Sequence, residues 1–339
     1  MRSVIYRETG GPDVLDVVER PDPRPGPGEV LVRVGVSGVN PTDWKSRSGS
    51  GPGRPAAFPT VVPNQDGAGT IVDVGPGVDR SRIGQRVWIW EAAWQRPEGT
   101  AQELVALPEG QAVALPDEAS FDLGASLGIP ALTAHRCLTV GTDGTTSLHP
   151  GALRGRTVLV AGGAGAVGHA AIELARWAGA TVIATVSSDE KAALATAAGA
   201  DHVVNYRRGK PAAGIKEFAP GGVDLIVEVS PAANASLDQK VLAPNGTLAA
   251  YASGAEPLTI DIRPAMVINA RYQFVLVYTV PADAKAQAVH DVSAAVAAGA
   301  LRVGPEAGLP VHRFPLERTA DAHTAVENNV VGKVLIDVE

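Results

Sequence analysis

The sequence predicts an α/β protein in which a doubly wound parallel sheet accompanies a β-rich region. Three observations support this fold class. Gly and Pro interrupt short strand-like segments over residues 1–125, and helical patterns begin near residue 120. Between residues 157 and 251, five apolar strand patterns alternate with helical patterns. This alternation is typical of βα units that build a parallel sheet covered by helices.

The β-rich region is predicted from patterns that alternate apolar and polar residues. Glu29–Val39 (EVLVRVGVSGV) is the clearest strand, and Gly69–Val74 and Arg86–Trp90 follow it. Two helices, Ala119–Gly128 and Ala131–Val140, are then predicted from their apolar periodicity. They mark the change to the alternating region.

Short apolar runs define the strands of the alternating region. The predicted strands are Thr157–Ala161, Thr181–Val186, His202–Asn205, Leu225–Val229 and Thr247–Tyr251. Helical patterns such as Glu190–Ala198 lie between them. Tyr272–Val280 then predicts a long apolar strand, Asp283–Ala298 a helix, and Lys333–Val338 a final strand.

The composition limits the possible partners. Of 339 residues, 45% are hydrophobic and 19% are charged, as in an ordinary globular chain. The net charge of −7 argues against a nucleic-acid partner, because phosphate binding needs clustered positive charge. No run of about 20 apolar residues predicts a membrane span. The single cysteine, Cys137, allows neither an internal disulfide nor a cysteine-rich zinc site, which favours a cytoplasmic setting.

A glycine-rich turn follows the first strand of the alternating region. Residues 162–168 read GGAGAVG, which contains the G-x-G-x-x-G pattern between a strand and a helix. In this pattern the first glycine permits a tight turn, the second admits a pyrophosphate, and the third packs helix on strand. The context identifies a Rossmann dinucleotide site. The predicted cradle is Gly163, Gly165, Ala166, Val167 and Gly168.

The end of the second strand indicates which dinucleotide binds. An NAD site usually carries an acid there for the ribose 2′-hydroxyl, but this chain has Ser187 and Ser188. Their hydroxyls, with Lys191 and Tyr206, suit a 2′-phosphate, so NADPH is the predicted cofactor. The two serines also fit the simple start of a helix, and both interpretations can hold together.

An ordered set of segments resembles the medium-chain dehydrogenase/reductase superfamily, and most closely its zeta-crystallin or quinone oxidoreductase branch. The segments, in addition to the glycine turn, are Gly38–Lys45 (GVNPTDWK), Pro63–Gly69 (PNQDGAG), Ile129–Ala134 (IPALTA), Gly199–Asp201 with Asn205–Tyr206, and Gly332–Val334 (GKV). Together they cover essentially the whole chain.

The resemblance implies two domains and an active site in the cleft between them. A GroES-like substrate domain is expected from residues 1–127 and 285–339, with the Rossmann NADPH domain, residues 128–284, inserted into it. A homodimer is also implied, and the long strand Tyr272–Val280 would then pair with its symmetry mate, since an exposed sheet edge is normally covered.

Zinc-binding relatives carry their metal ligands at positions that fall here on Asn40, Gln65 and the vicinity of Ile129, with a neighbouring acid position at Asp66. These residue types do not form a credible zinc site. Without a Lewis acid, oxidation of a simple alcohol is poorly supported. A quinone or an α,β-unsaturated carbonyl accepts hydride more easily, because its conjugation carries the charge.

The resemblance assigns roles to several further residues. Asn40, Lys45 and Thr133 are the candidate catalytic residues. Many relatives have tyrosine at the position of Lys45, and a lysine there could equally lie in water at the rim of the cleft. Thr133 is expected near the nicotinamide ribose or ring. The other expected cofactor contacts are Tyr251, which is also a candidate donor, the backbone around Leu276 and Val277, and Lys333.

Three functions remain open at the level of sequence. The first is an NADPH-dependent quinone reductase, and the second is an enoyl or alkenal double-bond reductase, possibly biosynthetic. The third is a non-enzymatic NADPH-binding protein, because some members of the resembling branch are lens structural proteins or bind RNA. Tryptophans 44, 88, 90 and 94 form either an aromatic wall for a flat quinone or part of the β-domain core.

Overall fold

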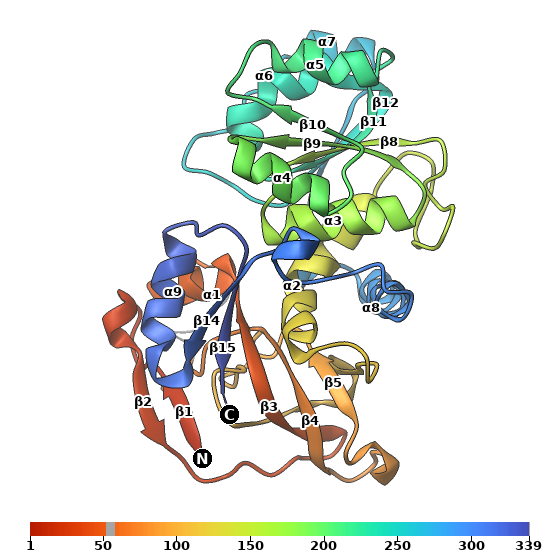
Figure 1. The fold of residues 1–339 in the computed structure, drawn as a ribbon. Coiled ribbons are helices and arrows are strands. Elements are labelled where there is room, and N and C mark those ends of the chain that lie inside the picture. Colours follow the sequence, from red (N-terminus) through yellow and green to blue (C-terminus); the bar gives the residue numbers. More distant parts are fainter. Residues whose placement is uncertain (52–57, 339) are drawn as a thin grey trace. The chain divides into compact units, whose positions relative to one another are not determined.

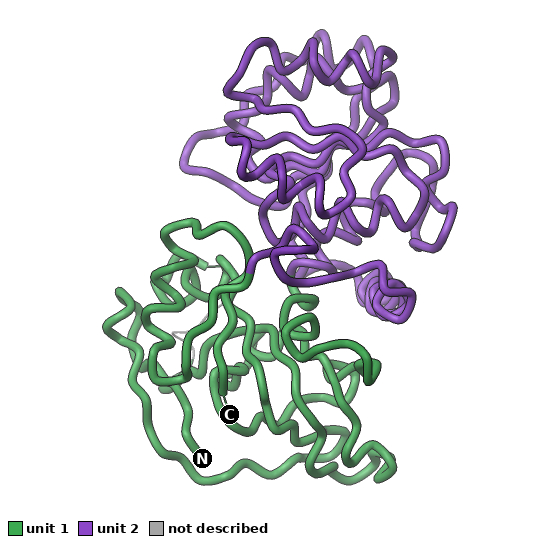
Figure 2. The backbone as a smooth tube through the Cα atoms, viewed as in Figure 1, with its two compact units in different colours: residues 1–129, 311–339 green, residues 130–310 purple. Residues whose placement is uncertain are grey.

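The computed structural model describes residues 1–51 and 58–338, which form two compact units. The first unit combines Met1–Ile129 with Val311–Glu339, and the second comprises Pro130–Pro310 (Figure 2). The second unit is therefore a single insertion into the first. The predicted α/β fold, with a parallel-sheet domain inserted into a β domain, is confirmed.

The first unit is built on a mainly antiparallel sheet with the strand order β14-β15-β3-β4-β5-β7, to which β6 adds by pairing with β3 (Figure 1). The strands are β3 (Glu29–Val39), β4 (Asp66–Val74), β5 (Arg86–Ile89), β6 (Leu104–Pro108), β7 (Ala112–Ala114), β14 (Val311–Pro315) and β15 (Lys333–Asp337). Because β15 pairs antiparallel with β3, Val334 lies opposite Val39. The C-terminal strand thus reaches the start of α1 (Pro41–Ser48), directly after β3.

Two more strands and one helix complete the description of the first unit. β1 (Arg2–Ile5) and β2 (Asp16–Glu19) pair antiparallel in a separate ribbon. α9 (Thr319–Glu327) contacts both α1 and β15. Buried valines and isoleucines from the main sheet form the core, including Val32, Ile71 and Ile336.

The second unit contains an all-parallel sheet with the order β10-β9-β8-β11-β12-β13. The strands are β8 (Thr157–Ala161), β9 (Thr181–Val186), β10 (His202–Asn205), β11 (Val223–Glu228), β12 (Leu242–Ala250) and β13 (Arg271–Phe274). The helices are α3 (Ala166–Trp177), α4 (Asp189–Ala197), α5 (Pro211–Phe218), α6 (Pro231–Val241), α7 (Ile262–Val267) and α8 (Ala282–Ala297). The strand order reverses between β8 and β11, which is the position where doubly wound sheets bind ligands.

One helix replaces the two that were predicted around residue 130. α2 runs without a break from Phe121 to Leu138 and contains Pro130. A proline normally interrupts a helix because it lacks an N–H and clashes with the preceding turn. Here the N–H of the preceding residue, Ile129, donates to the buried Asp66 carboxylate at 2.9 Å. The prediction of two separate helices was wrong, because the local signal of Pro130 does not show that one helix continues through it.

The long strand predicted at Tyr272–Val280 is also wrong. β13 ends at Phe274, and a 3-10 turn follows at Val277–Thr279. The neighbouring strand β12 ends at Ala250, which pairs with Phe274, so the chain has no further partner on that side. Val277 and Tyr278 are buried within this 3-10 turn.

The second unit continues beyond residue 284, the predicted end of the Rossmann domain. It continues to Pro310 and includes α8. The Asp291 carboxylate of α8 is bound by His135 Nε2 at 2.8 Å and by the Leu148 N–H at 2.6 Å. These buried contacts tie α8 to the second unit. Within the described ranges no helix is both long and apolar enough to cross a membrane.

Candidate functional site

The glycine-rich turn lies directly between β8 and α3. Gly162 has φ +69°, a conformation that disfavours side chains, so Gly162 rather than Gly163 makes the tight turn. Gly163 is required for packing, because a Cβ there would lie 2.9 Å from the Ala184 Cβ. The role predicted for the first glycine of the motif therefore moves one residue earlier along the chain.

The other two glycines fit the roles expected of a dinucleotide site. A Cβ on Gly168 would lie 2.4 Å from the Gly162 carbonyl oxygen, so α3 packs closely against the turn. A Cβ on Gly165 would meet only that same carbonyl, at 3.5 Å. The backbone at the N-cap of α3 is thus open to a ligand. The first turn of α3, including Ala166 and Val167, offers N–H groups suited to a pyrophosphate.

The residues predicted to bind the 2′-phosphate gather at one edge of the parallel sheet. Ser187 and Ser188 follow β9, and the Ser188 Oγ caps α4 by accepting the Lys191 N–H at 3.2 Å. The Tyr206 N–H donates to the Val186 carbonyl at 3.0 Å, which places Tyr206 beside the end of β9. The capping role of Ser188 leaves its hydroxyl proton available to a ligand.

Arg208 joins this edge, and sequence reasoning missed it. Its guanidinium binds both carboxylate oxygens of Asp189, with Nη1 to Oδ1 at 2.8 Å and Nη2 to Oδ2 at 2.9 Å. Both side chains are exposed. The pair offsets the charge of the acid next to the serines that are predicted to bind the phosphate. The available signal was the Arg207–Arg208 dipeptide just after Tyr206.

The remaining predicted cofactor residues belong to different parts of the chain. Tyr251 follows β12, its N–H donates to the Glu228 carbonyl at 3.1 Å, and burial raises the pKa of its phenol. Leu276 is exposed, whereas Val277 is buried in the turn after β13. Thr133 is buried on α2 within the second unit. Lys333 belongs to the first unit, so it is not part of the glycine-turn domain.

Asn40, Asp66 and Lys333 form a closed polar cluster in the first unit. Asn40 Nδ2 donates to Asp66 Oδ2 at 2.7 Å, and Lys333 Nζ donates to Asn40 Oδ1 at 2.8 Å. Lys333 Nζ lies 3.6 Å from Asp66 Oδ2. All three residues are at most 2% exposed. Burial raises the pKa of Asp66 despite the opposing ammonium of Lys333.

A second buried carboxyl lies beside this cluster. Asp43 Oδ2 accepts the Asn40 N–H at 2.6 Å, while the buried Oδ1 lies within 3.5 Å of no suitable donor among residues 1–51 and 58–338. Burial, reinforced by the charge of Asp66, raises the pKa of Asp43 to about 8. The Asp43 carboxyl therefore holds a proton near neutral pH.

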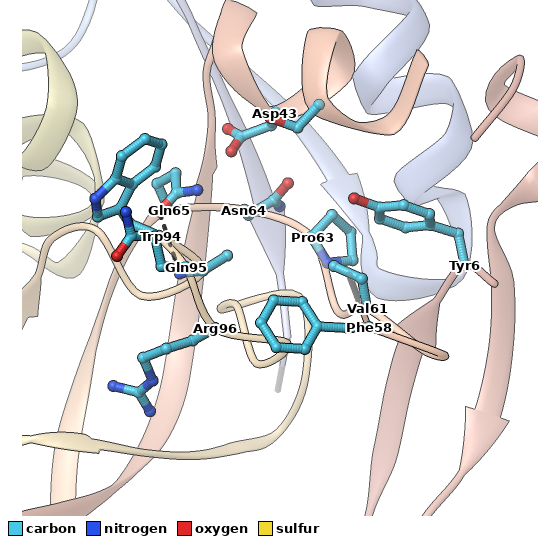
Figure 3. A pocket seen from close by; sticks show the side chains of 12 residues that line it. Tyr6, Asp43, Phe58, Val61, Pro63, Asn64, Gln65, Trp94, Gln95 and Arg96 are labelled. Carbon is cyan, nitrogen blue, oxygen red and sulfur yellow. Dashed lines mark hydrogen bonds between the residues drawn. The ribbon is translucent and has the colours of Figure 1, made fainter. Parts of the chain in front are cut away.

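Asp43 also lines a pocket in the first unit (Figure 3). The pocket is bounded by aromatic side chains, Tyr6, Phe58 and Trp94, and by the amides of Asn64 and Gln65. Gln65 is fixed because its Oε1 accepts the Ala93 N–H at 3.1 Å. Rings and hydrogen-bonding groups together give this lining the chemical character that suits a flat polar molecule.

The other proposed aromatic and donor residues have different positions. Trp88 is fully buried in the sheet, so it belongs to the core. Lys45 is half-buried on α1, and its Nζ lies 5.7 Å from the centre of the Trp44 ring. The described lining of the pocket includes neither Lys45 nor Asn40.

The residues at the zinc-ligand positions of the relatives do not fit a zinc ion. The Asn40 amide and the Asp66 carboxylate are both bound to the Lys333 ammonium, and Gln65 binds backbone. Zinc prefers four thiolate, imidazole or carboxylate ligands. Over residues 1–51 and 58–338, no group of three or more His, Cys, Asp or Glu side chains is arranged to hold a metal.

Comparison with known families matches both parts of the chain. Residues 26–117 match the alcohol dehydrogenase GroES-like domain, and residues 166–296 match the zinc-binding dehydrogenase family. Among curated proteins, quinone oxidoreductase of Rattus norvegicus is 32% identical over 99% of this chain and 97% of the rat protein. Quinone oxidoreductase of Homo sapiens is 30% identical with the same coverage.

Solved structures share the fold over the full length, and their named activities and cofactors differ. A mycobacterial protein in complex with NADPH is 30% identical, with a TM-score of 0.81 and 99% of both chains covered. An NAD-dependent alcohol dehydrogenase is 28% identical, with a TM-score of 0.84 and 100% of both chains covered.

Proposed function

The chain belongs to the quinone oxidoreductase branch of the medium-chain dehydrogenase/reductase superfamily, and we propose that it is an NADPH-dependent reductase that transfers hydride to a quinone. The observation that carries this proposal is the phosphate-binding edge of the second unit. There, Ser187 and Ser188 follow β9 where NAD-binding chains usually place an acid, and Lys191, Tyr206 and Arg208 are the further proposed phosphate contacts.

NADPH, when bound, supplies the hydride. The glycine turn and the start of α3 suit its pyrophosphate, because Gly165 leaves the backbone open. The hydroxyls and the guanidinium at the ends of β9 and β10 suit its 2′-phosphate. The NADPH complex of a relative that is 30% identical supports this choice of cofactor. Thr133, Tyr251 and the backbone at Leu276 and Val277 remain the proposed contacts of the nicotinamide half.

The first unit supplies the groups proposed to bind the acceptor. Its pocket combines Phe58, Tyr6 and Trp94 with fixed amides, which suits the flat ring and carbonyl oxygens of a quinone (Figure 3). Asn40 and Lys45 stay the proposed donors to the reduced oxygen. A conjugated acceptor needs no metal to accept hydride, in agreement with the poor fit to zinc.

A double-bond reductase is the second candidate function, and one observation favours it. Reduction of an enone or alkenal requires hydride at one carbon and a proton at the next. Asp43 lines the pocket with a buried carboxyl whose pKa is raised to about 8 by burial and by the charge of Asp66. Such a carboxyl can deliver a proton at neutral pH.

We further propose that the protein forms a homodimer. β13 is the last strand of the parallel sheet, so its outer edge lacks a strand neighbour within the described residues. Phe274 on β13 and the side chains of Ile262, Met266 and Val267 on α7 are exposed apolar groups. Pairing with a second copy would cover this edge.

A panel assay tests the function. The purified chain is given NADPH or NADH with 1,4-benzoquinone, a larger quinone, an enone or an alkenal, and cofactor oxidation is followed by absorbance. The proposal predicts the highest kcat/KM with NADPH and a quinone. Turnover of enones alone would assign the double-bond reductase. NADPH binding without any turnover would favour a non-enzymatic role.

A further inference from the structure

Lys333 brings an ammonium group into the interior of the first unit. It is the first residue of β15, whose pairing with β3 sets Val334 opposite Val39 and therefore brings Lys333 to Asn40, 293 positions away in sequence. In Figure 1, β15 lies directly beside β3. The side chain is 1% exposed. A buried charge is costly unless other groups compensate for it, so the surroundings of Lys333 decide its role.

The ammonium fixes the orientation of the Asn40 side chain. An ammonium group only donates hydrogen bonds, so the atom of Asn40 that faces it at 2.8 Å must be the carbonyl oxygen. The amide nitrogen then donates to Asp66 at 2.7 Å. That nitrogen carries two hydrogens, and the bond to Asp66 uses one of them. The second N–H can donate to a ligand.

This arrangement disagrees with the zinc chemistry that the matched dehydrogenase family implies. By the resemblance, Asn40 and Asp66 stand where zinc-binding relatives carry a ligand and a neighbouring acid, and both interact here with Lys333. A zinc ion bound to the same two side chains would lie next to a buried ammonium, and the two cations would repel each other. The Lys333 amino group, held by Asn40 and Asp66, already occupies the site. Burial lowers the pKa of Lys333, and the charge of Asp66 opposes that shift and favours the ammonium.

We propose that the ammonium of Lys333 is a built-in cation that replaces a metal ion in this cluster, and that Lys333 is a positioning residue which polarises the Asn40 amide for the acceptor. The catalytic part of this inference rests on the proposed function. Hydride transfer brings two electrons to the acceptor and leaves negative charge on its oxygen. The free Asn40 N–H, strengthened by the ammonium on Oδ1, stabilises that charge until a solvent proton completes the product.

Two variants separate the electrostatic role from a structural one. Lys333→Met keeps the length of the apolar stem but removes the charge, which leaves Asp66 buried without its cation. The double variant Asp66→Asn/Lys333→Met removes both charges together. We expect Lys333→Met to lower both the melting temperature and kcat, with kcat falling roughly 10- to 100-fold. The double variant regains the melting temperature and keeps the low kcat.

Substrate KM and the NADPH dissociation constant are expected to stay within about twofold in both variants, because the effect is on the transition state. Lys216→Met, on the exposed surface of the second unit, is the matched control and keeps wild-type values. Recovery of both stability and kcat in the double variant would show a purely structural role and overturn the proposal.

Metal analysis tests whether the Lys333 ammonium replaces a metal ion, and this test does not depend on enzyme activity. The wild-type chain, expressed with added zinc, is expected to retain no stoichiometric zinc, and its melting temperature is expected to be unchanged by a chelator. One zinc ion bound per chain would overturn the proposal that Lys333 replaces a metal ion. If the wild-type chain reduces no acceptor, the proposed function and the catalytic role of Lys333 both fail. The zinc content and the melting temperatures of the two variants still decide whether the ammonium occupies the cation site.

Discussion

Arg208 and Asp189 interact through two short contacts, of 2.8 Å and 2.9 Å, at the edge proposed to bind the 2′-phosphate. An unpaired acid at this point would repel a phosphate. The bidentate pair cancels that charge, and a planar guanidinium can also bind phosphate oxygens. The acid next to Ser188 is therefore compatible with a preference for NADPH.

Arg208→Ala is expected to weaken NADPH binding about 10- to 100-fold, since a hydrogen bond to a charged group contributes roughly 1.5–3 kcal/mol. NADH lacks the 2′-phosphate, so its affinity should change little. Isothermal titration of both cofactors measures the two dissociation constants.

The neighbouring Arg207→Ala is the matched control for this experiment. Arg207 is exposed, and its backbone N–H donates to Asn205 Oδ1. NADPH affinity should be close to the wild-type value. An equal loss with both variants, or an equal loss of NADH binding, would contradict a specific phosphate contact by Arg208.

At the residue scale, local motifs predicted part of the site and could not predict the rest. Ser187 and Tyr206 were recognisable because they follow strands whose carboxyl ends meet at one sheet edge. The bond between Asn40 and Lys333 joins residues 293 positions apart, so no local pattern marks it. The resemblance alone predicted that Lys333 contacts the cofactor. In the structure its ammonium donates to Asn40, which belongs to the first unit.

At the scale of elements, strands were predictable where their own composition decides their ends. β3, β8, β9 and β10 have the predicted bounds, because apolar runs stop there at Gly, Pro or polar residues. α2 and β13 were not predictable, because neighbours decide them. Pro130 stays inside α2 while the adjacent Ile129 N–H binds Asp66, and β13 ends where β12 offers no further partner.

Two buried carboxyls, one on β11 and one on α6, are expected to make the free energy of unfolding depend on pH. Asp238 on α6 and Glu228 on β11 are both buried, and burial together with the charge of Glu228 raises the pKa of Asp238 to about 9. The folded chain therefore keeps a proton that the unfolded chain loses near its ordinary pKa of 3.8. Stability from this group is full at low pH and is lost as the pH rises toward about 9.

Asp238→Asn is expected to reduce this dependence, because an amide does not titrate. The free energy of unfolding of the wild type should fall by up to about 1.4 kcal/mol per pH unit through this group, and the variant should show a flatter slope. Urea unfolding at about pH 5, 7 and 9 measures it. The exposed Asp117→Asn serves as control. Equal slopes in all three proteins would contradict a shared buried proton.

At the scale of the whole molecule, the sequence predicted both domain types and the insertion of one into the other. The βα alternation and the glycine turn are local features, so they were sufficient for the second unit. The end of the insertion was not predictable, because buried bonds from His135 and Leu148 to Asp291 assign α8 to the second unit. Such contacts become visible only in the fold.

The proposed dimer gives a prediction at the same scale. Phe274→Asp places a charge on the exposed edge strand β13, where Phe274 is 63% exposed. We expect the wild type to sediment as a dimer at micromolar concentration and this variant to sediment as a monomer with its fold retained. Phe218→Asp, which alters an exposed aromatic on α5, should remain dimeric. A monomeric wild type would contradict the proposal.

The central claim is that this chain passes hydride from NADPH to a quinone without a metal. A single-turnover reaction tests it most directly: the enzyme saturated with NADPH is mixed with a quinone, with and without a strong chelator, and both reactants are followed. The expected result is one NADPH oxidised for each quinone reduced, at a rate that the chelator leaves unchanged and that NADH does not match. Loss of turnover in chelator, or no quinone reduction by a folded, NADPH-bound enzyme, would contradict the claim.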